Sequence, residues 1–481
     1  MTTRRELLKL GTIYGASSLL ANQMELVNSV QAANSVQAAP LSCNPIVTND
    51  GIMVTDFSGT KWKPLWSNNP TLGRDYNVTL GITSRTGVGR MLRWGPIANS
   101  YEDIRLSHID LPSQAPISFN GRFGLWVYCD GMQGYGPGQT PSGILHIVMT
   151  TDPSGSFNNA VDIGFNPNQI REGWNFLKFV DNPTGHPLGI YKNFWGNGSS
   201  GDITNKPVYS ILIYTESQDI GVTWYLDSLW TGFRSVPQVV LGCDANGADL
   251  LNHCLPLFQS YGWLGYVASP FRVWTSGSKK VTNWNTDQSV LIAMAKAGWD
   301  IVNHTVNHLR VGDLTTVADI KYEIEAQDTY LRSLNIPTQG LKFYVSPYSS
   351  SSRLSETTIK NSWVVAQRHY RKWNTSITQF GIDNPHHIGS LDMGSFEYGQ
   401  TFANIKRQID IALAYEDTMH WFWHVVTSQG DPGNGTGNTG NLSAIYQSSW
   451  DLVMGYIRSL ELAGKMVVAR GFTGFFYNHY F

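Results

Sequence analysis

Two histidines, His304 and His308, stand four residues apart at the end of a short apolar run. That run contains Trp299, Ile301 and Val302 and is typical of a buried strand. If the segment turns helically, positions four apart share a face, so both imidazoles can converge on one cation. Two unrelated surface histidines would show the same spacing, so the surrounding polar residues decide what the pair means.

Several polar residues share one feature with this pair, because each falls near the expected carboxyl end of a predicted strand. They are Asp244, Pro347, Tyr348 and His424. The carboxyl ends of parallel strands meet at one edge of a sheet or one mouth of a barrel. We therefore expect Asp244 and His424 to gather around the histidine pair in a single pocket.

The second half of the chain, predicted as a domain at 236–481, alternates strand patterns with helical patterns. The predicted strands are Gln238–Cys243, Gly265–Ala268, Asp300–Val302, Lys342–Val345, Thr418–Val426 and Met466–Ala469. The predicted helices are Ala248–Tyr261, Thr286–Ala297, Leu314–Leu334, Ser355–Trp363, Thr401–Ala414 and Ser448–Ala463. Repeated β-α units of this length predict a parallel sheet or a closed (β/α) barrel.

The first half, predicted as a domain at 41–235, shows short strand patterns separated by Gly, Pro, Asn and Asp clusters. The clearest are Arg122–Cys129, Ile144–Thr150, Trp174–Val180, Val208–Tyr214 and Val222–Trp230. Long helical patterns are absent, which favours an antiparallel β-sandwich or jelly roll. The chain is thus predicted to be multidomain.

Composition narrows the class of protein. A length of 481 residues suits two or three domains, and 15% charged with 12% aromatic residues is typical of a loop-rich, extracellular or carbohydrate-handling protein. The net charge of -2 argues against nucleic acid as a partner. The four cysteines form no C-x-x-C pair, so no thiolate zinc site is expected. Their pairing stays open; they are Cys43, Cys129, Cys243 and Cys254.

The N-terminus begins with Arg4-Arg5, then Leu7-Leu8-Lys9 and the weakly apolar run Leu10–Leu20. This arrangement resembles a twin-arginine export signal, which implies a periplasmic or secreted protein with a signal peptide over residues 1–39. A frayed basic N-terminus is the alternative. The apolar run is too short to span a bilayer, and no later segment reaches the necessary length.

Four segments of the second half together resemble the polysaccharide deacetylases, the NodB-like carbohydrate esterases. Gly242-Cys243-Asp244 stands in place of the family's first motif, and His304–His308 fits the second, H-[ST]-x-x-H, without change. Val345-Ser346-Pro347-Tyr348 corresponds to the third motif, and His424 to the histidine of the late strand motif. In the first half, Tyr225–Leu229 and Arg171–Asn175 look like parts of carbohydrate-binding jelly-roll modules; whether this half binds glycan stays open.

The resemblance implies a distorted (β/α) barrel and a metal-dependent hydrolase that removes N- or O-acetyl groups from a polysaccharide or oligosaccharide. His304 and His308 would hold a divalent metal, zinc first, with cobalt and nickel as alternatives. Asp244 would act as general base and His424 as general acid. The backbone N–H of Tyr348 would bind the oxyanion.

The sequence departs from the family at two places. Ala245 stands where the family has an aspartate metal ligand, so either Asn246 or Asp244 itself would have to complete the shell. Val345 replaces the arginine that orients the catalytic aspartate, so Asp244 is expected to lack that partner. These losses leave a second hypothesis, a catalytically impaired deacetylase-like protein that binds glycan or has a structural role.

Three other polar features are weaker candidates. His386 and His387 are adjacent, and adjacent side chains of extended chain point apart, so a loop role is expected. His369 lies in a helical pattern and is expected to be a surface or packed residue. The stretch Asn384–Asp392 resembles a late segment of some deacetylases, which would place Asp392 at the border of the site.

Overall fold

The structure is a computed structural model. It describes residues 47–57, 91–96, 101–107, 116–131, 144–166, 169–196, 203–216, 221–244, 247–271, 273–274, 281–282, 288–370, 377–378, 381–394, 401–428 and 444–480. The predicted export signal at 1–39 lies outside the described residues, as do Cys43, Ala245 and Asn246.

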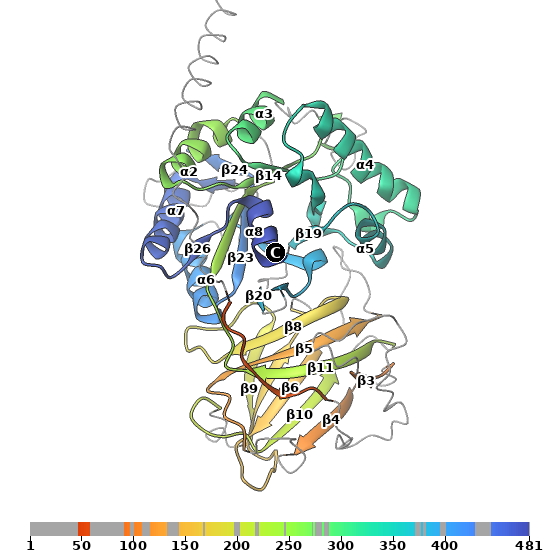
Figure 1. The fold of residues 1–481 in the computed structure, drawn as a ribbon, viewed down its shortest axis with the longest axis vertical. Coiled ribbons are helices and arrows are strands. Elements are labelled where there is room, and N and C mark those ends of the chain that lie inside the picture. The colour runs from red at the N-terminus through yellow and green to blue at the C-terminus, as the bar shows by residue number, and fades with distance from the viewer. Residues whose placement is uncertain are drawn as a thin grey trace, which may run out of the picture.

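The first half of the chain forms two antiparallel sheets (Figure 1). One has the order β4 (Tyr101–Ser107), β10 (Ser210–Glu216), β6 (Ile144–Thr150), β7 (Ala160–Phe165) and β9 (Ile190–Trp195). The other has the order β2 (Ile52–Thr55), β11 (Thr223–Thr231), β5 (Arg122–Asp130) and β8 (Gly173–Val180), with β3 (Leu92–Trp94) also paired to β11. The short β1 (Val47–Asn49) pairs with β12 (Arg234–Ser235).

Side chains of both sheets share one buried core. Phe123, Leu125 and Val127 alternate along β5, and Leu145 and Ile147 alternate along β6; all belong to the same cluster. This period of two buries one face of each strand against the other sheet. The predicted antiparallel sheets are therefore confirmed, whereas the jelly-roll module stays a prediction.

The second half forms a closed ring of parallel strands. In order they are β13 (Gln238–Cys243), β14 (Tyr266–Ser269), β17 (Asp300–Asn303), β18 (Phe343–Val345), β19 (Ala366–Tyr370), β22 (Ile388–Asp392) and β23 (Thr418–Trp423). The ring closes because β13 pairs with both β14 and β23, and β26 (Val467–Val468) adds a short strand beside β13. The predicted (β/α) barrel is confirmed.

Helices surround the ring (Figure 1). They are α2 (Leu255–Tyr261), preceded by η2 (Leu250–Cys254), α3 (Gln288–Lys296), α4 (Val317–Ser333), α5 (Arg353–Lys360), α6 (Phe402–Tyr415) and α7 (Gln447–Leu462). Polar N-caps start three of them: the side chains of Thr316, Ser352 and Thr401 accept backbone N–H groups of the first turn.

The last helix, α8 (Gly471–Tyr480), lies within the ring rather than outside it (Figure 1). Phe472, Phe475 and Phe476 of this helix share a buried cluster with inward side chains of the strands, such as Val302 and Phe343. Barrel interiors are filled by side chains, and here a helix supplies part of that filling. The functional residues are thereby confined to the opposite, carboxyl-terminal mouth.

Two strands of the ring, β19 and β22, were not among the predicted strands. The helical pattern assigned to His369 is wrong, because this residue lies in β19. Gln367, Arg368 and His369 are all buried, as expected for a parallel strand covered on both faces. Polar residues at such positions hide the continuous apolar run that usually reveals a parallel strand.

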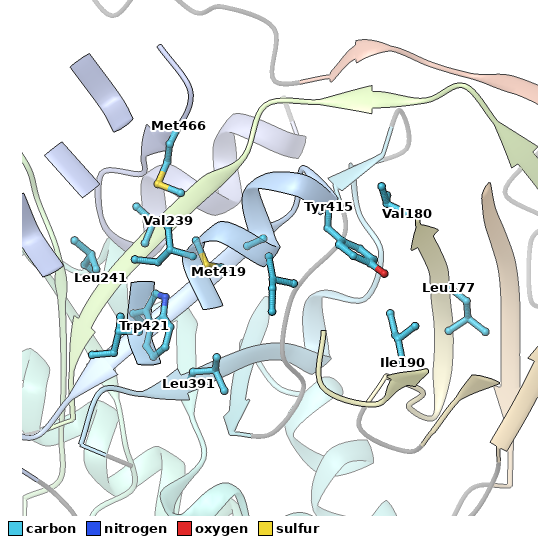
Figure 2. Close-up of a cluster of buried hydrophobic side chains, with 14 of the residues drawn as sticks. Leu177, Val180, Ile190, Val239, Leu241, Leu391, Tyr415, Met419, Trp421 and Met466 are labelled. Carbon is cyan, nitrogen blue, oxygen red and sulfur yellow. The ribbon is translucent and has the colours of Figure 1, made fainter. Parts of the chain in front are cut away.

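The sandwich and the barrel pack against each other through apolar and charged contacts. Figure 2 shows Val180 and Ile190 of the sandwich near Tyr415 of the barrel, all within one buried cluster. His186 lies 2.7 Å from the hydroxyl of Tyr415. Lys178 of β8 forms a buried ion pair with Asp417. One contiguous core therefore extends from the first half of the chain into the second.

Two further sequence questions are answered in part. Cys129, Cys243 and Cys254 are buried, and no disulfide joins any of them to another described residue. Among the described helices, none combines the length and apolarity that crossing a bilayer requires.

Candidate active site

Strand register brings Asp244 and His424 together although they are far apart in the sequence. β13 and β23 are parallel neighbours with Cys243 opposite Trp423, so the residues that follow leave the ring at the same level. The N–H of Asp244 donates to the carbonyl of Trp423 at 2.9 Å. Asp244 is buried, and His424 is partly exposed at the mouth.

His304 and His308 converge, but not by a helical turn. Their ring centroids lie 4.9 Å apart, while Thr305 and His308 adopt left-handed backbone conformations with φ of 63° and 55°. Glu323 of α4 fixes this irregular loop: its carboxylate accepts the N–H of Asn307 at 3.0 Å and the amide of the same residue at 2.7 Å. The predicted proximity of the two rings is present, and the helical reason given for it is wrong.

The tautomer of His304 follows from its partner. Its Nδ1 lies 2.7 Å from the carbonyl oxygen of Val345. Because a carbonyl only accepts, Nδ1–H donates and Nε2 keeps its lone pair. Burial lowers the pKa of His304 to about 3, and burial likewise lowers the pKa of His308 to about 3. Both rings are therefore neutral at physiological pH, as metal ligands must be.

Asp244 has an arginine partner, contrary to the sequence expectation. Arg368 of β19, the strand after the third motif, forms an ion pair with Oδ2 of Asp244 and donates to the hydroxyl of Tyr266 at 2.6 Å. Its guanidinium also lies 4.1 Å from the ring centroid of Phe422. Val345 pairs with Arg368 across β18 and β19, so an arginine one strand further along reaches the same carboxylate.

Arg368 leaves the other oxygen of Asp244 available. Oδ1 is buried and has no hydrogen-bond partner. An unpaired buried carboxylate oxygen is costly, which makes it a place where a ligand or a reacting proton belongs. Asp244 also interacts electrostatically with His308, so its carboxylate lies near the histidine pair.

Asp392 accompanies His424. Asp392 ends β22 opposite Phe422 of β23, and its Oδ2 lies 3.6 Å from Nδ1 of His424. Burial raises the pKa of Asp392 to about 6, against the opposing effect of His424. The position of Asp392 beside the predicted acid agrees with the sequence expectation that it borders the site.

Tyr348 contacts the histidine pair through its side chain. Its hydroxyl lies 3.1 Å from Nδ1 of His308, and the guanidinium of Arg310 lies 5.1 Å from its ring centroid. Tyr348 has a left-handed φ of 55°, an uncommon conformation for a residue with a β-carbon, and such strain is concentrated at functional sites. Asp249 supports the cluster from a distance, because its carboxylate accepts the N–H of Val426 at 3.0 Å.

The donor set suits a divalent cation only in part. His304 and His308 supply two neutral imidazoles, and Asp244, whose Oδ1 has no hydrogen-bond partner, interacts electrostatically with His308. Ala245 and Asn246, where the resemblance would look for a third ligand, lie outside the described residues. Among the described residues, these two imidazoles and the Asp244 carboxylate do not bring three ligand atoms within 4.8 Å of one another, so the part of a zinc-type donor set that is in place is the histidine pair.

A second group of ligand-type side chains was missed by sequence reasoning. Among the described residues, the one set of three such side chains with atoms within 4.8 Å of one another is Glu356, His369 and His387. The three come from α5, β19 and η6 (Pro385–His387). The loop role expected for His387 is thus incomplete, because it faces two partners distant in sequence.

Comparison with known proteins agrees with the motifs. The family model described as polysaccharide deacetylase matches residues 221–362, less than half of the chain. This range contains Asp244, the histidine pair and Tyr348, but ends before Arg368 and His424. No curated protein matches the chain.

Several solved structures are similar to about half of the chain. A peptidoglycan N-acetylglucosamine deacetylase shows 13% identity over 50% of this chain and 88% of its own, with a TM-score of 0.34. A family 4 carbohydrate esterase from Streptomyces lividans shows 11% identity over 48% and 91%, with a TM-score of 0.29. A pseudoenzyme of carbohydrate esterase family 4 from Bacillus anthracis shows 9% over 50% and 65%, with a TM-score of 0.33.

The family model, the barrel and the order of the motifs point the same way. Residues 221–362 match the polysaccharide deacetylase family, the family that the motifs of the sequence resemble.

Proposed function

We propose that the chain is a divalent-metal-dependent polysaccharide deacetylase that hydrolyses N- or O-acetyl groups of a glycan. The observation that carries this proposal is the buried, unpartnered Oδ1 of Asp244, on a carboxylate that lies near two neutral histidines. A divalent cation held by His304 and His308, when bound, would polarise the acetyl carbonyl and lower the pKa of the attacking water.

Asp244 acts as the general base. Its Oδ1 takes the proton of the water that attacks the acetyl carbon, while Oδ2 stays paired to Arg368. The arginine holds the carboxylate in one orientation. Arg368 is thus a positioning residue that acts through Asp244.

His424 acts as the general acid. Its partial exposure at the mouth lets it reach the amine or alcohol that leaves the tetrahedral intermediate. The carboxylate of Asp392 lies beside His424, 3.6 Å from its Nδ1. The proton that Asp244 removes from water and the proton that His424 donates together balance the hydrolysis to acetate and a deacetylated sugar.

Tyr348 has two roles in this proposal. Its hydroxyl orients His308, and the backbone N–H, set in a left-handed turn after Pro347, holds the oxyanion. The half-exposed ring of Tyr348, at 49% of its full accessible area, offers a surface for the sugar beside the mouth.

A glycan-binding or structural protein with impaired catalysis is the second candidate, favoured by Ala245. If the missing aspartate limits metal affinity, Ala245→Asp should raise zinc affinity about tenfold or more, since a carboxylate ligand adds charge to a site with two neutral imidazoles. Equilibrium dialysis against buffered zinc measures this change. Unaltered affinity would mean that Asp244 already completes the site.

Export by the twin-arginine route, to the periplasm or the medium, accompanies this proposal, since acetylated polysaccharides are cell-surface or external substrates. Replacing Arg4 and Arg5 by lysine should retain the chain in the cytoplasm, as fractionation would reveal.

Acetate release tests the proposed function. The wild-type chain, loaded with zinc or cobalt, is incubated with acetylated chito-oligosaccharides and with acetylated xylan, and His304→Ala serves as the metal-site variant. Acetate from either glycan that is lost in His304→Ala supports the deacetylase. Glycan binding without acetate, in a metal-loaded chain, favours the second candidate.

A further inference from the structure

A second cluster of ligand-type side chains lies on the outer face of β19. Glu356 of α5, His369 of β19 and His387 of η6 have ligand atoms within 4.8 Å of one another. All three residues are at least nine-tenths buried, with 9%, 5% and 4% of their surface exposed. Two imidazoles and one carboxylate form a ligand set that binds zinc-class cations.

The cluster contains polar atoms that nothing else satisfies. Nε2 of His369 and Oε1 of Glu356 are buried and have no hydrogen-bond partner. Burying two polar atoms without hydrogen-bond partners in one cluster costs folding free energy. A bound cation would coordinate both atoms and remove that cost.

The spacing suits tetrahedral coordination. Nε2 of His387 lies 3.5 Å from Oε2 of Glu356. Two ligand atoms at about 2.0–2.1 Å from a zinc ion, on neighbouring tetrahedral positions, lie about 3.3 Å apart. The rings of His369 and His387 are stacked, with centroids 5.3 Å apart and an interplanar angle of 24°, and each offers a ring nitrogen within 4.8 Å of a carboxylate oxygen of Glu356.

Outer hydrogen bonds orient the ligands, as they do in metal sites generally. The backbone of His386 is hydrogen-bonded to the His369 ring, and since Nε2 has no partner, that bond falls on Nδ1. The lone pair of Nε2 is therefore free for a cation. The side chain of Ser351 is hydrogen-bonded to the Glu356 carboxylate.

The cluster borders a cavity between the barrel and the sandwich. This cavity has a volume of about 540 Å³ and is lined by Glu356 and His387 together with Trp174 and Glu172 of the sandwich and Lys360 of α5. Asn384, just before η6, donates to the carbonyl of Trp174 at 3.0 Å, so the sandwich holds this segment in place. A cation bound by the three residues would have its fourth position open toward the cavity.

We propose that Glu356, His369 and His387 form a second cation site, of the zinc class, distinct from the cluster around Asp244. The two sites lie back to back on β19, because consecutive residues of a strand point to opposite faces. Arg368 faces the barrel interior and holds Asp244, and His369 faces outward. The outer cation joins α5, β19 and η6 where they meet the sandwich.

A shared proton is the competing occupant. A protonated Glu356 could donate to Nε2 of His369 and leave no room for a cation. Arg171 also interacts electrostatically with both residues, and its positive charge opposes a cation, whereas the charge of Glu172 favours one. The experiment therefore has to measure the metal directly.

Metal content and location are measured on the full chain. The His304→Ala/His308→Ala variant, which removes the inner imidazoles, is dialysed against zinc, its zinc content is measured, and crystals are examined by anomalous diffraction at the zinc edge. The proposal predicts about one zinc per chain, with its anomalous peak between Glu356, His369 and His387. Absence of that peak from crystals soaked in zinc overturns it, whether or not the deacetylase proposal holds.

Variants test the ligand set. His387→Gln, added to the same background, should lower the bound zinc from about one equivalent to nearly none. His386→Gln is the matched control, because it lines the same cavity but is outside the ligand set. Loss of zinc in His386→Gln, or full retention in His387→Gln, overturns the assignment. The absorption spectrum of the cobalt-loaded His304→Ala/His308→Ala variant is a second measurement, and it does not depend on whether His387→Gln folds. Absorption bands of tetrahedral cobalt support the site, and their absence contradicts it.

Discussion

The two faces of β19 make an instructive comparison. On the inner face, the two terminal nitrogens of Arg368 contact Asp244 and Tyr266 and its guanidinium lies over Phe422, while Nε of Arg368 and Oδ1 of Asp244 have no hydrogen-bond partner. On the outer face, His369 and Glu356 have unpartnered atoms that face each other deep in the fold. Both faces bury polar groups, but only the inner one pairs opposite charges.

The ion pair on the inner face and the ligand-type cluster on the outer face suit different chemistry. In the proposed function, the ion pair on the inner face keeps the Asp244 carboxylate oriented for proton transfer. The outer face gathers two imidazoles and a carboxylate away from the predicted reaction centre, which suits a tightly held cation. In the two proposals, a single strand therefore positions the general base through one residue and a cation ligand through the next.

Removing the predicted acid should have the largest effect. We expect His424→Ala to lower kcat for deacetylation by about 10²–10⁴-fold, because proton donation to the leaving group is lost. The outer variant His387→Gln should keep most of the activity, since it contacts no group of the inner cluster. Steady-state kinetics on an acetylated glycan measures kcat of both variants. An equal loss of kcat in His424→Ala and His387→Gln would contradict the proposed difference between the two faces of β19.

Breaking the inner ion pair should come next. Arg368→Met leaves Asp244 buried without its partner, which we expect to lower the free energy of unfolding by about 3–5 kcal/mol. Urea denaturation measures this loss. Arg368→Lys keeps the positive charge, but a single ammonium group cannot donate to Asp244 and Tyr266 in the way that the two terminal nitrogens of the guanidinium do. Its stability should therefore lie between those of Arg368→Met and the wild type. Full stability in Arg368→Met would show that the pair contributes nothing.

Zinc bound at the outer site should raise the free energy of unfolding. In the His304→Ala/His308→Ala background, free zinc at a hundred times its dissociation constant should raise the free energy of unfolding by about 2.7 kcal/mol. Adding His387→Gln should remove this gain, while His386→Gln should keep it. The urea midpoint with and without zinc provides the measurement; a gain that survives His387→Gln would locate the zinc elsewhere.

The smallest effect concerns pH. Burial raises the pKa of Asp392 to about 6 in the folded chain, above its ordinary value of about 4, so the folded state holds an extra proton between these values. The stability that this proton contributes is complete below about pH 4 and is lost as pH rises through about 6. Asp392→Asn should therefore gain stability relative to wild type from pH 4 to 7, as urea titrations at several pH values would show. If the free energies of unfolding of Asp392→Asn and the wild type differed by the same amount at every pH from 4 to 7, the raised pKa of Asp392 would be contradicted.

The sequence predicted the inner site better than the outer one for a physical reason. Asp244, the histidine pair and His424 each fall near the expected carboxyl end of a predicted strand, and parallel topology forces such ends together. Arg368 was missed because its pairing with Asp244 depends on the register of β19, which no spacing in the sequence encodes. The alternation of Ala366, Arg368 and Tyr370 was the available signal for that strand.

The outer cluster had no comparable signal. Glu356 lies in a helix, His369 in a strand with polar neighbours, and His387 in a short turn, and only the packed fold brings the three together. The irregular loop that carries His304 and His308 also depends on contacts that are distant in sequence. Contacts from α4, and not local helical geometry, set where His308 points.

Acetate release by wild type and by Asp244→Asn is the most direct measurement of the central claim. Asparagine keeps the shape of the side chain but cannot take a proton from water. We predict that the metal-loaded wild-type chain releases acetate from an acetylated glycan and that Asp244→Asn, folded and with a similar metal content, does not. Equal acetate release by the two proteins, or none from a folded and metal-loaded wild-type chain on either glycan, would contradict it.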